Sequence, residues 1–100
     1  MSVRIPVDRE KIAEFCRRSH IKRLAFFGSV LRDDFRPDSD VDVLVEFEAG
    51  YHVGLIRFSG MEIQLSEILG RKVDLRTPED LSRYFRKEVL AAAQVQYAKK

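Results

Sequence analysis

Cysteine is almost absent from this sequence, with Cys16 the only one in 100 residues. A single thiol cannot form an internal disulfide, and it offers no thiolate cluster for a zinc ion. Cys16 follows Phe15 in an apolar stretch. We therefore interpret it as a small buried hydrophobic residue.

Long apolar runs and a surplus of one charge are also missing. The first residues, MSVRIPVDREK, lack the apolar core of roughly 7 to 15 residues that a signal peptide has, and no later run could span a bilayer. Lys and Arg total 18 against 16 Asp and Glu, and the net charge of +2 does not indicate binding to a phosphate backbone, which needs a concentrated basic face. We expect a cytoplasmic protein without a membrane partner and without direct nucleic-acid binding.

Hydrophobic periodicity predicts one α/β domain over residues 1–100, in the order α-β-α-β-α-β-α. Strands are expected at residues 23–27, 41–47 and 71–76. Helices are expected from Asp8, from Ser29 as a short turn, over residues 55–70, and from Thr77 towards Tyr97. The last helix is predicted to bury a stripe made of Leu81, Tyr84, Phe85, Val89 and Ala92.

Two aspartates enter the second strand on one face. Because strand side chains alternate, Asp40 and Asp42 are expected opposite Val41, Val43 and Val45. Like charges at this spacing raise each other's pKa unless a cation lies between them, and Mg²⁺ prefers such oxygen ligands. Alone, the pair is more typical of a solvated acidic turn at the start of a strand than of a metal site.

Two further features favour a phosphate site. Gly28 and Ser29 stand between a strand and a helix start, where backbone N–H groups favour an anion. Asp74 interrupts the apolar third strand, in which aspartate is disfavoured. If the second and third strands are neighbours, Asp74 joins Asp40 and Asp42 as a third carboxylate, as in a two-metal phosphoryl-transfer site.

The stretches GSVLRDDFRPDSDVDVLVEF and LGRKVDL resemble the minimal nucleotidyltransferase (MNT) family of the DNA polymerase beta-like superfamily. The family pattern is Gly-Ser, then Asp-x-Asp, then a later Asp. The matching positions are Gly28, Ser29, Asp40, Asp42 and Asp74, with Arg32, Pro37 and Ser39 also where such proteins have them. The departures are Leu31 and Asp33, neither of which removes a ligand.

The resemblance implies a small mixed three-stranded sheet with helices packed against it, ATP as substrate and a two-metal Mg²⁺ site. Asp40, Asp42 and Asp74 would be the catalytic and metal-binding residues, with Asp74 orienting or deprotonating the incoming hydroxyl. The nucleotide would be bound by Gly28, Ser29, Arg32 and Ser39. Arg36 is a further candidate phosphate contact, with a solvated loop arginine as the alternative.

Small members of this family resemble antitoxins that transfer AMP to a tyrosine of a helical HEPN ribonuclease toxin. That is the function we expect. The alternatives are a nucleotide-binding module that inhibits its partner by contact, and a small-molecule nucleotidyltransferase acting with a separate substrate-binding chain. For partner docking we expect exposed residues at Tyr51, His52 and Val53 or at Tyr97, unless Tyr51 folds back onto the core.

Overall fold

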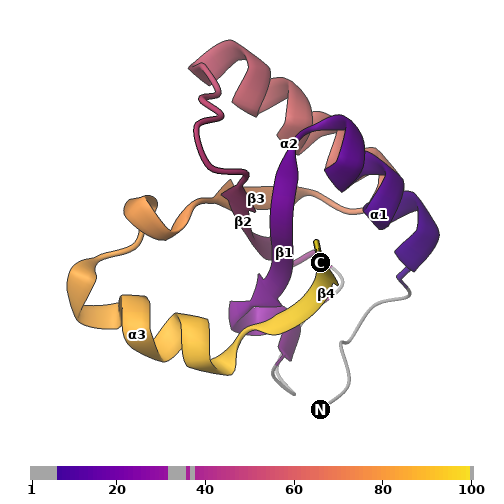
Figure 1. The fold of residues 1–100 in the computed structure, drawn as a ribbon. Helices are drawn as coiled ribbons and strands as arrows, with labels where there is room; N and C mark the ends of the chain where they lie inside the picture. Colours follow the sequence, from indigo (N-terminus) through magenta and orange to yellow (C-terminus); the bar gives the residue numbers. More distant parts are fainter. Residues whose placement is uncertain (1–6, 32–35, 37, 100) are drawn as a thin grey trace.

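The computed structural model describes residues 7–31, 36 and 38–99, apart from the side chain of Ser29. Its helices and strands follow one another as in Figure 1. In order they are α1 (Arg9–Arg18), β1 (Ile21–Phe27), η1 (Gly28–Leu31), β2 (Val41–Phe47), α2 (Leu55–Leu69), β3 (Val73–Arg76), η2 (Pro78–Asp80), α3 (Arg83–Ala92) and β4 (Gln94–Ala98).

The strands form one mixed sheet in the order β3-β2-β1-β4. β1 runs antiparallel to both β2 and β4, whereas β2 and β3 are parallel. A parallel pair needs a crossover connection, and α2 provides it. The predicted fold class is therefore confirmed, but the sheet has four strands rather than the three expected.

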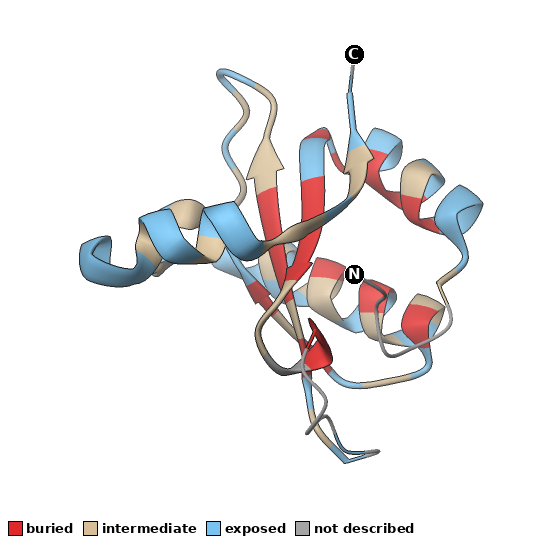
Figure 2. Ribbon diagram, turned by 90° about the horizontal axis from the view of Figure 1, so that it is seen from below, coloured by how far each residue is buried: buried red, intermediate tan, exposed pale blue. Residues whose placement is uncertain are grey.

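The main core lies between one face of this sheet and helices α1 and α2 (Figure 2). Val43 of β2, Phe26 of β1 and Phe15 of α1 are all fully buried there. The helix ends carry the expected signals. Asp8 caps α1 by accepting a hydrogen bond from the backbone N–H of Lys11 at 3.1 Å, and Gly70 ends α2 in the left-handed conformation. Leu55, the first residue of α2, is 86% exposed.

The last helix differs from the prediction in its bounds and in its burial. Asp80 accepts hydrogen bonds from the backbone N–H and the hydroxyl of Thr77, but this cap starts only the short 3-10 helix η2. The α-helix begins at Arg83, after Ser82 caps it. None of the residues of α3, all of which the structure describes, is buried, and Tyr84 and Phe85 are 75% and 61% exposed.

The chain after α3 turns into a strand. Ala93 leaves the helical conformation, and β4 pairs with the edge of β1 that β2 leaves open. Tyr97 of β4 lies opposite Leu24 and packs against the core. Tyr97 is therefore neither a helix end nor an exposed docking residue. Hydrogen bonding to an open sheet edge outweighed local helix propensity here.

No helix among the described residues combines the length and the apolar character that crossing a membrane requires.

Candidate functional site

Asp42 and Asp74 lie side by side on neighbouring strands. In the parallel register of β2 and β3 they are direct partners, and such strands are about 4.8 Å apart. Both side chains are half-buried, whereas their neighbours Val43 and Val73 point into the core. The two carboxylates therefore share the sheet face that α1 and α2 leave uncovered.

Gly28 brings the turn after β1 directly against this carboxylate pair. Its φ of 74° lies in the left-handed region that favours glycine. A Cβ added at this position would overlap the Oδ2 atom of Asp42. Gly28 is thus required both by its backbone conformation and by the closeness of the Asp42 side chain. The predicted glycine turn and the predicted strand aspartate meet in space.

Arg76 is a member of this cluster that the sequence reasoning missed. Its Nε donates to Oδ1 of Asp74 at 3.1 Å, and its Nη2 donates to Oδ2 at 3.2 Å. The hydrogen bonds and the charge of Asp74 raise the pKa of the Arg76 guanidinium, and the nearby charges of Asp80 and Asp42 add to the effect. The available signal was spacing: Arg76 follows Asp74 by two positions in a strand, which places both side chains on one face.

The remaining predicted residues lie at the loop before β2 or outside the described residues. Asp40 directly precedes β2 and is exposed. The hydroxyl of Ser39 accepts a hydrogen bond from the backbone N–H of Arg36 at 3.2 Å, so Ser39 stabilises the turn that leads to Asp40. The Ser29 backbone belongs to η1, but its side chain lies outside the description, as do Arg32, Asp33 and Pro37.

The donor set fits Mg²⁺ in ligand type. Carboxylate oxygens are the ligands that Mg²⁺ takes, and it commonly uses one or two of them together with water and substrate phosphates. Asp42 and Asp74 supply such a pair from rigid strands. Within the described ranges, no three Asp, Glu, His or Cys side chains are already grouped as metal ligands would be. A cation bound at Asp74 would have to displace the hydrogen bonds that Arg76 donates to both oxygens of this carboxylate.

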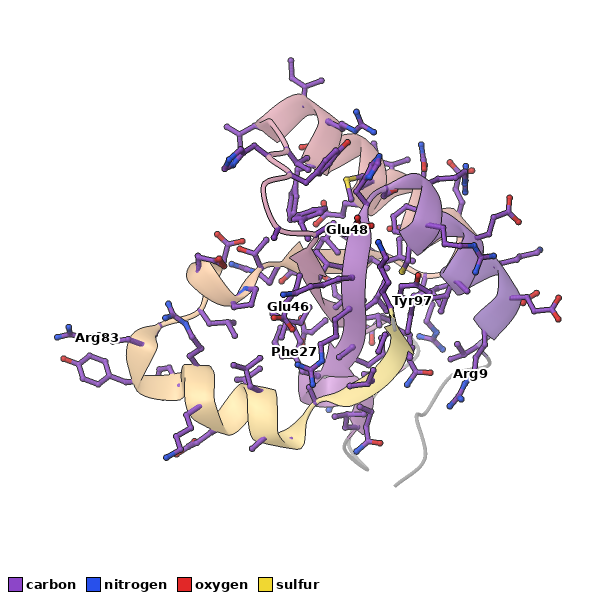
Figure 3. All side chains as sticks on the ribbon, in the orientation of Figure 1. Arg9, Phe27, Glu46, Glu48, Arg83 and Tyr97 are labelled. Carbon is purple, nitrogen blue, oxygen red and sulfur yellow. The ribbon has the colours of Figure 1, made fainter. Side chains whose placement is uncertain are left out.

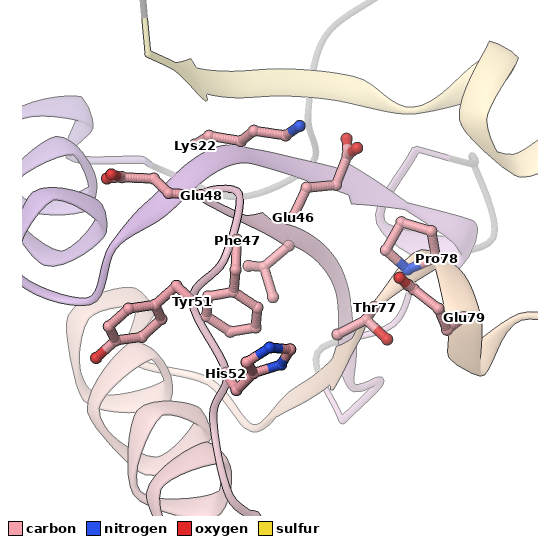
Figure 4. Close-up of a pocket in the computed structure, with 10 residues that line it drawn as sticks. Lys22, Glu46, Phe47, Glu48, Tyr51, His52, Thr77, Pro78 and Glu79 are labelled. Atoms are coloured by element: carbon pink, nitrogen blue, oxygen red, sulfur yellow. The ribbon is translucent and has the colours of Figure 1, made fainter.

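A separate cavity of about 490 Å³ lies at the other end of β2, around Phe47, and is shown in Figure 4. Neither Asp42 nor Asp74 lines this cavity, although Thr77, which does, follows Asp74 by only three positions. His52 and Thr77 line it from facing segments. Tyr51 also lines it, but its ring stacks on that of His20 at 4.2 Å. Tyr51 is half-buried and stacks on the exposed His20, and it is not among the residues packed against the main core, so it is neither fully exposed nor folded back onto the core.

Comparison with known proteins identifies the family. The model of the nucleotidyltransferase domain family matches residues 9–95, so this chain belongs to that family. Protein adenylyltransferase MntA of Thermococcus cleftensis is 36% identical over 77 residues, which are 77% of this chain and 76% of that protein. A protein of Methanocaldococcus jannaschii, named provisionally as a protein adenylyltransferase, is 31% identical over 85 residues, or 85% of this chain and 89% of that protein.

Solved structures agree with this assignment. A chain described as a minimal nucleotidyltransferase superposes with a TM-score of 0.70 at 36% identity, and the match covers 85% of each chain. A toxin–antitoxin complex with AMP-PNP contains a chain that superposes with a TM-score of 0.74 over 94% of this chain and 76% of that chain. At 19% identity the second likeness shows the shared fold alone. The predicted enzyme class, a nucleotidyltransferase like the protein adenylyltransferases, is confirmed.

Proposed function

We propose that this protein transfers AMP from ATP to a tyrosine hydroxyl of a helical HEPN-type partner and so acts as an antitoxin. The observation that carries the proposal is the pairing of Asp42 with Asp74 beside Gly28 on the uncovered sheet face. Support for a protein acceptor comes from relatives named protein adenylyltransferases. Support for the partner comes from a structure of the same fold, described as a tri-AMPylated HEPN toxin of Shewanella oneidensis in complex with an MNT antitoxin.

The chemistry assigned to the site is an in-line displacement. The tyrosine oxygen forms a bond to the α-phosphorus of ATP, the bond from that phosphorus to the bridging oxygen breaks, and pyrophosphate leaves. Asp40, Asp42 and Asp74 would hold Mg²⁺, which would supply positive charge to the triphosphate during the displacement. Asp74 would orient the tyrosine hydroxyl and accept its proton. The backbone at Gly28 and Ser29 would hold phosphate oxygens, since a residue without Cβ leaves the closest approach open.

The test is mass spectrometry of a candidate HEPN-type partner after it is incubated with this protein, ATP and Mg²⁺. We expect an increase by one or more AMP units with the unmodified enzyme and none with Asp42→Asn, because the amide keeps the shape but loses the charge that holds the cation.

The matched control is Glu46→Gln, which makes the same carboxylate-to-amide change on the same strand and the same face, four positions away. It should leave the transfer unchanged. Equal labelling by Asp42→Asn and by the unmodified enzyme would refute the proposed site. Binding of the partner with no labelling by either protein would favour inhibition by contact instead.

A further inference from the structure

Arg76 holds both oxygens of the Asp74 carboxylate. The guanidinium donates through Nε and Nη2 at 3.1 and 3.2 Å, which is the paired, planar arrangement that arginine makes with carboxylates. The same Oδ1 and Oδ2 atoms would be the ligands of a divalent cation in the proposed site. Arg76 and the metal therefore compete for the same atoms.

The position of Arg76 makes such an exchange feasible. The Arg76 and Asp74 side chains are 47% and 36% exposed, so water reaches both partners of the ion pair. Pairs of this kind contribute little net stability, because water competes for both partners. A metal carrying two charges can displace the guanidinium, whereas a deeply buried pair would resist it.

The displaced guanidinium would remain next to the reaction site. Arg76 is on the same strand and the same face as Asp74, and Asp42 lies on the neighbouring strand at the partner position of Asp74. A triphosphate brought in with the metal would place anionic oxygens at this end of the sheet. Arginine binds phosphate through the same fork of N–H donors that it offers to a carboxylate.

We infer that Arg76 is a placeholder cation for the proposed metal site. It occupies Asp74 in the nucleotide-free protein, yields Asp74 when the cation and the triphosphate arrive together, and then contacts the phosphates. Arg76 is a positioning residue with respect to the metal, because it acts through Asp74. The inference rests on the proposed function, and it predicts that the metal alone binds more weakly than the metal with nucleotide.

The experiment titrates the protein with Mn²⁺, and separately with the Mn²⁺–ATP complex, in the absence of acceptor. Free Mn²⁺ is followed by electron paramagnetic resonance, and the complex is followed by calorimetry. Arg76→Gln should bind Mn²⁺ alone about twofold to fivefold more tightly, the range expected when a competing exposed ion pair is removed. It should bind Mn²⁺–ATP about twofold to fivefold more weakly, because the phosphate contact is lost.

The matched control is Arg23→Gln. Arg23 pairs with Glu46 at 3.4 Å on the same sheet face, and its side chain is 52% exposed, close to that of Arg76. This variant should change neither affinity. Equal tightening of Mn²⁺ in both variants would reduce the effect to net charge and overturn the inference. So would unchanged or weaker Mn²⁺ binding by Arg76→Gln, or tighter binding of Mn²⁺–ATP.

Asp74→Asn separates this inference from the proposed function. If Asp74→Asn binds Mn²⁺–ATP as tightly as the unmodified protein, the metal site itself is wrongly placed. If Asp74→Asn loses that binding while Arg76→Gln leaves Mn²⁺ binding unchanged, the site stands and only the placeholder role fails. Thermal unfolding of each variant without metal verifies that the fold is retained.

Discussion

The two faces of strand β2 have opposite characters. Val41, Val43 and Val45 on one face are fully buried under helices α1 and α2, whereas Asp42 and Glu46 on the other face are only half-buried. Figure 3 shows the same division around β1: Glu46 and Phe27 lie on the side towards α3, and Tyr97 lies on the opposite side. Burying a carboxylate costs more free energy than burying a valine, which agrees with the more open face that carries Asp42 and Glu46.

Helix α3 flanks the open face without sealing it. Only its end approaches the sheet, where Leu90 and Val95 line a small cleft with Leu44. Leu44 is consequently 2% exposed, the one fully covered side chain of β2 on this face. The rest of α3 extends away from the sheet, as Figures 1 and 2 show. The comparison teaches that the buried apolar side chains are concentrated on one face of the sheet, and the residues of the candidate site on the other.

The largest expected difference between the two faces of the sheet is found at two adjacent phenylalanines of β1. Phe26 is fully buried, and its replacement by alanine should lower the free energy of unfolding by about 3 to 5 kcal/mol. Phe27→Ala, on the half-exposed face, should cost about 1 kcal/mol. Urea denaturation measures both values. Similar losses for the two variants would mean that the second face is as closed as the first.

Substitutions at two glycines with positive φ distinguish the effect of backbone strain from the effect of the Gly28–Asp42 contact. Gly28→Ala and Gly50→Ala each force alanine into a left-handed conformation and should each cost about 1 to 2 kcal/mol. At Gly28 the new methyl also overlaps Asp42, whereas nothing lies within 4 Å at Gly50. Gly28→Ala should therefore reduce AMP transfer by about tenfold or more, because misplaced catalytic groups are costly. An equal loss of transfer for Gly50→Ala would contradict the role of the Gly28–Asp42 contact.

Because Cys16 is buried, its thiol makes the free energy of unfolding depend on pH. Burial raises the pKa of the Cys16 thiol from 9.0 to about 12, with the charge of Arg17 acting in the opposite direction. Between these two pH values the folded protein keeps a proton that the unfolded chain loses. This contribution to the free energy of unfolding is therefore present below pH 9 and falls by up to about 1.4 kcal/mol per pH unit above it.

The variant Cys16→Ala removes the contribution of the thiol to the pH dependence of the unfolding free energy, whereas every other titratable group is unchanged. The difference in unfolding free energy between the unmodified protein and Cys16→Ala should shrink as the pH rises from 9 to 11. A difference that is independent of pH would show that the thiol is not shielded from water as its burial implies.

Phe85 provides the smallest expected effect. It is 61% exposed on α3, so Phe85→Ser should change the free energy of unfolding by no more than about 0.5 kcal/mol. The sequence pattern predicts that Phe85 belongs to a buried stripe, and its replacement would then lower the free energy of unfolding by several times more. Urea denaturation of this variant distinguishes the two interpretations directly.

In the first three quarters of the chain, much of the secondary structure could be predicted from local sequence patterns. The alternation in VDVLVEF assigned Val41, Val43 and Val45 to the core, and Asp8 and Gly70 marked helix ends, because caps and periodicity act within a few residues. The last quarter could not. Residues 94–98 form a strand because β1 offers an open edge, and a distant edge leaves no trace in local propensity.

The sequence by itself determined the family pattern of glycine, serine and three aspartates, since those residue types must be present for the chemistry. Only the tertiary structure decided which of them meet. The parallel register sets Asp42 beside Asp74, the turn at Gly28 places a backbone without Cβ against Asp42, and Arg76 engages both oxygens of Asp74. The physical reason is that register and crossover geometry come from packing α2 across β2 and β3, which joins positions more than thirty residues apart.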